Sequence, residues 1–155
     1  LEQIEADPPD VVVIQTTETS EDSSLELLRP GIKRLVERLT DEGVTVIGFR
    51  DNPRSEKSLY ECASSVGPQT MVGGCVFPKE DVMAAEDPAK FLEENPLFHQ
   101  IDPSDMLCPD DVCGTIIGDV FVYMDGNHIS ATYSRTMAPE LASRIKQTMG
   151  IDEPN

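Results

Sequence analysis

Two side chains with catalytic potential lie three positions apart in the segment "YMDGNHIS", residues 123–130. They are Asp125 and His128, and His128 is one of only two histidines in the chain. An imidazole held by a carboxylate is the base of nucleophilic acyl transfer, because the carboxylate fixes the tautomer while the other ring nitrogen takes a proton from a hydroxyl nucleophile. Three residues of a turn, or of a first helical turn, can bring the two side chains together. The spacing therefore allows such a pair.

The same residues also have a purely structural interpretation. Asp125 can cap a Gly/Asn turn, and His128 can be a surface residue or a cap of the following helix, because Asp and His are common at such positions. His99 lies within a short apolar segment, which favours a packing or sheet-edge position. A metal-binding module of Asp125, His128 and nearby acids is a third possibility, but two ligands in one turn are too few. We therefore expect no metal and no cofactor.

The four cysteines form two local pairs, Cys62 with Cys75 and Cys108 with Cys113, each closing a short loop rich in Gly, Pro or Asp. This pattern favours two disulfides, and disulfides imply an oxidising compartment. The alternative is a four-cysteine zinc site, but the two-residue spacing typical of zinc knuckles is absent.

Apolar periodicity predicts the elements that must position these residues. The run "DVVVIQT" at 10–16 predicts a strand buried on both faces, and "VTVIGFR" at 44–50 predicts a second strand. The helix between them begins near Leu25 or Pro30, ends near Glu42 and has Gly43 as its C-terminal cap, so the three form a parallel βαβ unit. After the second strand we expect a long loop over 51–78 and a weaker helix over 79–94, interrupted near Pro88. A third strand over 97–102 and a small hairpin about the "GD" at 118–119 should follow. The last helix should span 131–149, with Ser130 as its N-cap and Gly150 after its end.

This order of elements predicts an α/β layered domain with a mostly parallel sheet. In such sheets ligands bind beyond the carboxyl ends of the strands. We therefore expect the polar segments after the first two strands, and the turn at Asp125, to meet at one end of the sheet.

Length and charge limit the function further. A chain of 155 residues is long enough for one domain and too short for two ordinary ones. The net charge of −17 repels phosphate backbones and anionic lipids, so we expect no binding to nucleic acid or to membrane surfaces. The apolar runs are far shorter than the roughly 20 residues that cross a bilayer, and we expect neither a transmembrane helix nor a signal peptide in these residues. The chain begins at Leu1 without a methionine, and we expect it to be a piece of a longer protein.

The sequence from "LCPDDVC" through "GDVFVYMDGNHISATYSRTMAPEL" resembles the end of the SGNH hydrolase-type domain attached to bacterial acyltransferase-3 membrane proteins, which O-acylate cell-surface polysaccharides. That family has a cysteine loop, an apolar run, Tyr, Asp, two residues, His, and a Leu/Ile–Ser/Thr pair before a helix. The corresponding residues are, in this order, Cys108, Cys113, Tyr123, Asp125, His128, Ile129 and Ser130. "ADPPDVVVIQT" and "VTVIGFRDNP" resemble the family's middle strands, and the loop from Cys62 to Cys75 has the position of its other cysteine pair. The resemblance covers nearly the whole chain.

The resemblance implies a single SGNH-type domain over residues 1–155, with the three-layer α/β/α, flavodoxin-like architecture of that family. It implies that Asp125 and His128 are two members of a Ser–His–Asp triad in an esterase or O-acyltransferase for acyl, especially acetyl, esters of cell-surface polysaccharide. The expected partners are an acyl-ester or glycan substrate and an upstream transmembrane acyltransferase domain. The expected location is extracytoplasmic, in the periplasm or at the cell surface, with the full-length protein tethered to the membrane.

The chain departs from the family at the nucleophile. The family's serine lies in a Gly-Asp-Ser motif after its first strand, and no Gly-Asp-Ser occurs in these 155 residues. We therefore expect the chain to be the carboxy-terminal part of the domain, incomplete at its amino end and inactive alone. Because the missing strand would lie beside residues 10–16, we also expect that run to be an exposed edge and the chain alone to be unstable or to associate. The alternative is a catalytically inactive SGNH-like domain for surface or carbohydrate interaction.

The donors of an oxyanion hole are the second departure. After its first strand the chain has "QTTETSED", without the Gly-x-Asn-Asp of many family members. Gln15 or Thr16 could donate a hydrogen bond towards a substrate, but strand-end residues satisfied within the protein are the expected role. The residues that bind the oxyanion and the substrate stay unknown at this point.

Overall fold

The structure, a computed structural model, describes residue 4 and residues 7–20, 26–56, 58–66 and 75–151. The chain forms two compact units and passes between them several times. The sheet unit comprises residues 1–18, 27–51 and 86–102, and the disulfide unit comprises residues 19–26, 52–85 and 103–155. Each unit has its own cluster of buried apolar side chains. The expectation of a single domain stays a prediction.

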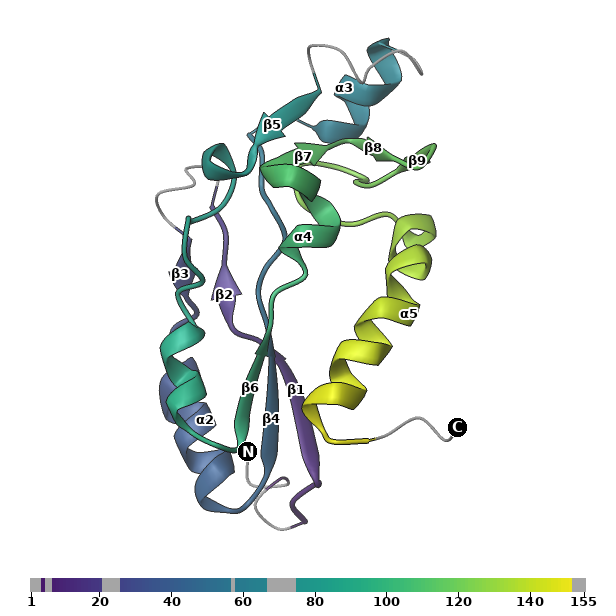
Figure 1. Cartoon of the computed structure of the whole chain (residues 1–155). Helices are drawn as coiled ribbons and strands as arrows, with labels where there is room; N and C mark the ends of the chain where they lie inside the picture. Colours follow the sequence, from purple (N-terminus) through teal and green to yellow (C-terminus); the bar gives the residue numbers. More distant parts are fainter. Residues whose placement is uncertain (1–3, 5–6, 21–25, 57, 67–74, 152–155) are drawn as a thin grey trace. The chain divides into compact units, whose positions relative to one another are not determined.

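The sheet unit is built on three parallel strands, β1 (Val11–Gln15), β4 (Thr45–Phe49) and β6 (Phe98–Ile101), in the order β1-β4-β6 (Figure 1). Val11 is opposite Thr45, and Val46 is opposite Phe98. All three strands lie where the sequence predicted them, the first two from runs of β-branched residues. Helix α2 (Ile32–Asp41) connects β1 to β4, which confirms the βαβ unit and the α/β class.

The core of the sheet unit lies between α2 and the strands. The helix contributes residues at helical spacing, and these pack against side chains from the strands and from the segment before β6; the buried members are Ile32, Val36, Leu39, Val44, Val46, Ala89, Leu92 and Phe98. The helix ends before Gly43, whose φ of 79° lies in the left-handed region that glycine adopts without a Cβ clash. This confirms Gly43 as the predicted cap.

For the start of this unit, one expectation is wrong and another is right in part. Strand β1 is not buried on both faces: it pairs with β4, and Val13 is 58% exposed. The helix begins near Pro30, as one of the two expected starts has it, and not near Leu25. Leu27–Leu28 instead form the short strand β3, which pairs antiparallel with β2 (Thr17–Glu18), and α2 begins only after Gly31. Leu25 itself lies outside the described residues.

The prediction of a helix over 79–94 is also wrong. Only two short 3₁₀ helices form, η2 (Lys79–Asp81) and η3 (Lys90–Glu94). The Asp87 carboxylate accepts a hydrogen bond from the backbone N–H of Ala89 (2.8 Å), which caps a new turn there. Pro88 has no N–H to continue a helix. Together these two residues divide the segment.

The disulfide unit consists of several short elements and the long helix α5 (Figure 1). They are α3 (Leu59–Val66), β5 (Val76–Pro78), α4 (Ser104–Leu107), the 3₁₀ helix η4 (Pro109–Asp111), β7 (Val112–Gly114), β8 (Ile116–Ile117), β9 (Val120–Phe121) and α5 (Ala131–Thr148). Strands β5 and β7 pair antiparallel, as do β8 and β9. The loop expected over 51–78 is therefore wrong in part, because it contains α3 and β5.

The hairpin and the last helix are confirmed. Gly118 and Asp119, at the hairpin turn, both have positive φ (57° and 62°), as a two-residue primed turn requires. The Ser130 Oγ accepts a hydrogen bond from the N–H of Tyr133 (3.1 Å) and caps α5, which runs to Thr148 before Gly150.

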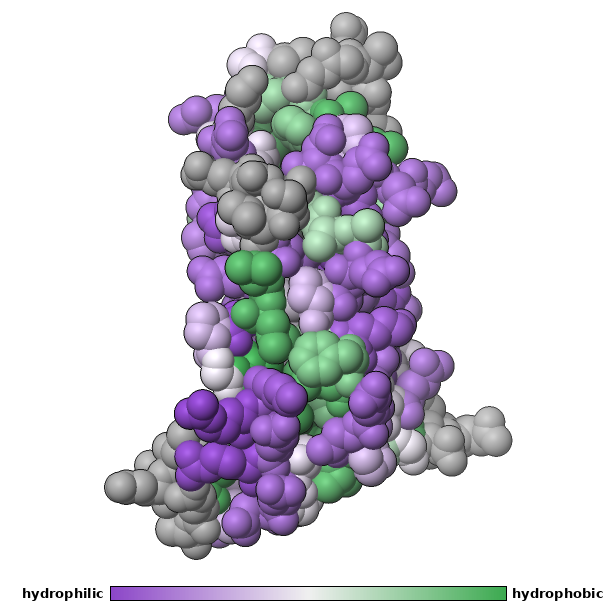
Figure 2. All heavy atoms as spheres, turned by 90° about the vertical axis from the view of Figure 1, so that its left-hand side faces the viewer, coloured by the Kyte–Doolittle hydropathy of each residue, from purple (hydrophilic) through white to green (hydrophobic). Residues whose placement is uncertain are grey.

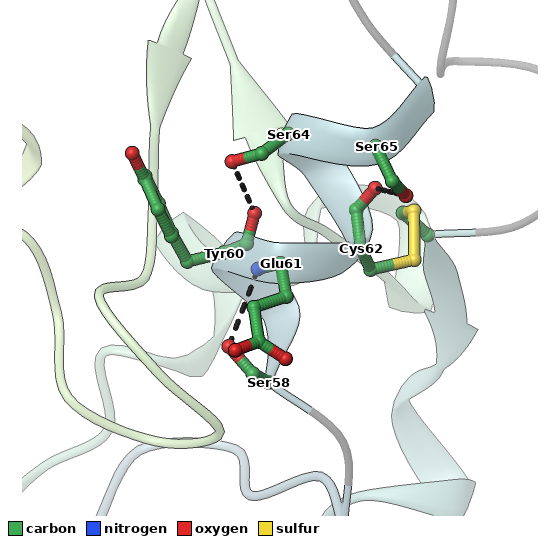
Figure 3. Close-up of a disulfide and its surroundings, with 7 residues drawn as sticks. Ser58, Tyr60, Glu61, Cys62, Ser64 and Ser65 are labelled. Atoms are coloured by element: carbon green, nitrogen blue, oxygen red, sulfur yellow. Dashed lines mark hydrogen bonds between the residues drawn. A yellow bond between two sulfur atoms is a disulfide. The ribbon is translucent and has the colours of Figure 1, made fainter.

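Both predicted disulfides are present, Cys62–Cys75 and Cys108–Cys113. Figure 3 shows Cys62 on α3, where the Ser58 Oγ accepts a hydrogen bond from the N–H of Glu61 (3.2 Å) at the start of the helix. The second disulfide is part of the unit's core, and the buried members of that core are Leu59, Val82, Met83, Leu107, Cys108, Cys113, Val122, Tyr123, Tyr133 and Met137. Since all four cysteines are cross-linked, none is available as a thiolate ligand.

Hydrophilic side chains predominate on the face shown in Figure 2, with an apolar stretch among them. This agrees with the net charge of −17. None of the helices in the described ranges is long and apolar enough to cross a bilayer.

Candidate functional site

Asp125 and His128 are in direct contact. Nδ1 of His128 lies 2.6 Å from Oδ2 of Asp125. The other carboxylate oxygen, Oδ1, accepts hydrogen bonds from the backbone N–H groups of Asn127 and His128, both at 2.8 Å. One carboxylate oxygen therefore caps the turn and the other holds the imidazole, whereas a catalytic role of the pair stays a prediction.

The electrostatics of the pair follow from these hydrogen bonds. The N–H of Asn127, then the N–H of His128, and the His128 side chain lower the pKa of Asp125 to about 2. Asp125 is thus ionised at neutral pH and can only accept a hydrogen bond, so Nδ1 must carry the proton of a neutral imidazole. Nε2, on the opposite side of the ring, then has the free lone pair that a general base needs.

The pair is open to solvent. The His128 side chain is 76% exposed and that of Asp125 is 51% exposed. Exposed ion pairs contribute little to stability, about 0–1 kcal/mol. The arrangement instead leaves the oriented imidazole accessible from solvent.

Buried residues and backbone hydrogen bonds hold the base of the turn. Val122 and Tyr123 precede it and are buried, with 0% and 1% exposure. Across the turn the N–H of Met124 donates to the His128 carbonyl (2.8 Å), and the N–H of Ser130 donates to the Val122 carbonyl (2.7 Å). The segments before and after Asp125 and His128 are thereby joined, and the turn continues directly into α5.

Tyr123, the tyrosine of the motif, belongs to the core and not to the solvent-exposed pair. Burial, and then the neighbouring Tyr133, raises the pKa of its hydroxyl well above the usual range. In the described part of the chain, this hydroxyl is the one buried side-chain polar atom without a hydrogen-bond partner. Its ring supports the turn by packing.

The other residues considered from the sequence lie in the sheet unit. The Gln15 amide donates to the Thr17 carbonyl (3.1 Å) and accepts from Arg29 (3.2 Å). Thr16 is fully buried and is bonded to the Phe49 carbonyl and the Gln100 side chain. These contacts favour the strand-end role over an oxyanion donor.

His99 lies in β6 opposite Ile47, in a sheet position as expected. The expected meeting of the Asp125 turn with the strand ends involves both units and stays a prediction. Among the described residues, no three His, Cys, Asp or Glu side chains are grouped so that they could hold a metal ion.

The structure adds polar residues that sequence reasoning missed. In the sheet unit, buried Arg50 donates to Asp102 (2.9 Å), and each of the two directly follows a strand, a position that could have indicated them. In the disulfide unit, Asn127 is only 6% exposed and is hydrogen-bonded to Arg54 (3.0 Å). No pattern in the sequence connects Arg54 to the turn.

A family model described as "SGNH domain (fused to AT3 domains)" matches residues 1–143. This range includes Asp125, His128 and all four cysteines. No curated protein and no solved structure matches the chain.

Proposed function

Because the chain belongs to the family of SGNH domains fused to AT3 domains, we propose that it is part of an extracytoplasmic serine-type esterase or O-acyltransferase. Its substrates are acyl, above all acetyl, esters of cell-surface polysaccharide. Asp125 and His128 are two members of its triad. The contact of 2.6 Å between Nδ1 of His128 and Oδ2 of Asp125 is the observation that carries this proposal.

The reaction begins when a serine Oγ attacks the carbonyl carbon of the acyl ester. As the new C–O bond forms, Nε2 of His128 takes the proton from the hydroxyl. The ionised Asp125 stabilises the imidazolium and keeps Nδ1 protonated. Nε2 then gives the proton to the departing alkoxide as the ester C–O bond breaks.

The second half of the reaction repeats these steps with a new nucleophile. Water or a sugar hydroxyl attacks the acyl-enzyme and passes its proton to Nε2, and the proton then returns to the serine as the acyl group leaves. Water gives hydrolysis, whereas a sugar hydroxyl gives transfer. Asp125 and His128 have the same roles in both.

The serine comes from a segment outside residues 1–155, together with the strand that pairs with the free edge of β1. Two observations support this: no Gly-Asp-Ser occurs in the chain, and among the described strands of this sheet β1 pairs with β4 alone. The two disulfides suit an oxidising, extracytoplasmic compartment. The fusion to AT3 domains that describes the family supports a transmembrane acyltransferase domain as the partner.

The absence of Gly-Asp-Ser also favours a second candidate function. In that case the protein is a catalytically inactive SGNH-like domain that binds surface carbohydrate, and Asp125 has only its turn-capping role. The two functions differ in a simple way, since only the first requires an upstream nucleophile and a basic His128.

The test is turnover of p-nitrophenyl acetate by the protein that contains this chain together with its preceding segment. The His128→Ala variant is the comparison. We expect turnover in the parent protein and its loss in the variant, because the serine then has no base. Turnover that is absent from the well-folded parent, or unchanged in the variant, would move the assignment to the inactive domain.

A further inference from the structure

A second segment of the disulfide unit, residues 52–59, binds the turn that contains Asp125 and His128. We propose that Arg54 and Asn127 are positioning residues that hold this turn in the geometry required for proton transfer. The inference rests on the proposed function, because Arg54 and Asn127 would act on the reaction only through the Asp125–His128 pair.

The Asn127 side chain is fully engaged in this contact. Its Nδ2 donates to the carbonyls of Asn52 (3.0 Å) and Pro53 (3.2 Å). Its Oδ1 accepts from Nη2 of Arg54 (3.0 Å). Because the amide has both its donors and its acceptor in use while it is 6% exposed, only asparagine in this orientation satisfies the site.

Arg54 connects the amide to a third part of the chain. Its Nε donates to the carbonyl of Thr19 (2.9 Å) while its Nη2 binds Asn127. Thr19 in turn donates its hydroxyl to the Asn52 carbonyl (2.9 Å), one of the two carbonyls that Asn127 also binds. The guanidinium thus fixes the distance between the turn and the residues that face it.

The backbone of the turn is held as well. The N–H of Ser55 donates to the Gly126 carbonyl (2.9 Å), and the N–H of Leu59 donates to the Asp125 carbonyl (3.1 Å). Residues 125, 126 and 127 are therefore each bonded to segment 52–59, whereas the His128 side chain projects into solvent with 76% exposure.

This anchoring acts directly on the acid–base pair. The backbone N–H groups of Asn127 and His128 orient the Asp125 carboxylate. A movement of the Asn127 backbone would therefore move the donors that fix this carboxylate. The neighbouring residues Asn127 and His128 face opposite ways, one inward and one outward. Holding the first therefore determines where the imidazole of the second points.

The kinetic test uses the protein that contains this chain with its preceding segment, and p-nitrophenyl acetate as the probe. We expect Asn127→Ala and Arg54→Lys to lower kcat about 10- to 100-fold with little change in KM, because a displaced base costs up to about 10²-fold. Lysine at position 54 keeps the positive charge but lacks the planar fork through which Arg54 binds both the Thr19 carbonyl and the Asn127 side chain. Arg135→Ala, which removes an exposed arginine of α5 in the same unit, is the control and should keep full activity.

A double-variant comparison separates positioning from loss of structure. In the Asp125→Asn background, Arg54→Lys should cause no further loss of kcat, because the pair through which it acts is already broken. An equal loss in both backgrounds, or an unchanged kcat in Asn127→Ala and Arg54→Lys, would overturn the proposal.

A spectroscopic measurement does not depend on activity. The ring ¹⁵N shifts of His128 report which nitrogen carries the proton, and they are assigned by their loss in His128→Ala; we expect in the parent protein the ¹⁵N signal of a protonated Nδ1. We expect the signal to broaden or disappear in Asn127→Ala and to persist in Arg135→Ala. If His128→Ala leaves turnover unchanged, the proposed function fails, but persistence of this signal in Asn127→Ala would separately overturn the positioning role.

Discussion

In the sheet unit, three neighbouring parallel strands and a ten-residue helix enclose a core of aliphatic and aromatic side chains. In the disulfide unit, each strand has only two or three residues, two disulfides cross-link the loops, and long-range hydrogen bonds such as Arg54 to Asn127 join segments 73 residues apart. Both units bury a cluster of apolar side chains, but strands of two or three residues form few backbone pairings, so covalent and side-chain links supplement them in the disulfide unit. The candidate site lies in this second unit.

The largest effect on stability should come from the core of the sheet unit. Phe98 is 1% exposed, and we expect Phe98→Ala to lower the free energy of unfolding of this unit by about 3–5 kcal/mol, because it leaves a cavity. Amide hydrogen exchange in β4 measures the change. Phe91→Ala is the matched control, since Phe91 is 48% exposed in the same unit and its loss should cost well under about 1 kcal/mol. Equal effects of the two would show that the unit does not rely on its core.

The disulfides should have the second largest effect on the free energy of unfolding, mainly that of the disulfide unit. The Cys62–Cys75 bond closes a sequence separation of 13 and the Cys108–Cys113 bond one of 5, so replacing each pair by alanine should cost about 3 and about 2 kcal/mol. Hydrogen exchange before and after reduction with dithiothreitol measures the loss in each unit. If the sheet unit loses as much protection as the disulfide unit, the contrast between the two is wrong.

The smallest expected effect is the dependence of stability on pH. The contributions of Asp125 and Asp87, one in each unit, change in opposite directions as the pH rises. In the disulfide unit, N–H groups lower the pKa of Asp125 to about 2 from its ordinary 3.8, so its contribution to stability is present above about pH 4 and is lost as the pH falls towards 2. In the sheet unit, burial raises the pKa of Asp87, so its contribution is present at low pH and is lost as the pH rises through its folded pKa. Carboxyl carbon NMR titration distinguishes them: a midpoint for Asp125 at or above that for Asp87 would contradict this difference.

The sequence allowed the fold to be predicted where periodicity and caps act over many residues. Strands β1, β4 and β6, helix α2 and helix α5 have long apolar patterns or clear terminal residues such as Gly43 and Ser130. Helix α3 was missed because it is short and lies among Ser, Gly and Pro residues. The pair β2 and β3 was missed because two residues per strand give no period.

The same limit applied to the candidate site. Asp125 and His128 were predicted because the contact between them is local, three residues apart. Arg54 could not be predicted, because its role depends on how the chain brings residues 19, 54 and 127 together. Local chemistry is visible in a sequence, whereas the residues that hold it in place are often distant along the chain.

The most direct test of the central claim is kcat for p-nitrophenyl acetate in the Asp125→Asn variant of the protein with its preceding segment. Asparagine can still accept the two N–H groups of the turn through Oδ1, but in place of Oδ2 it has an amide that cannot accept the Nδ1 proton, so the turn is kept and the tautomer is lost. We predict a fall in kcat of up to about 10⁴-fold with an unchanged fold, by analogy with serine proteases. Asp105→Asn, an exposed carboxylate of α4 in the same unit, should leave kcat unchanged. A kcat for Asp125→Asn equal to that of the parent would contradict the assignment of Asp125 and His128 to an acyl-transfer site.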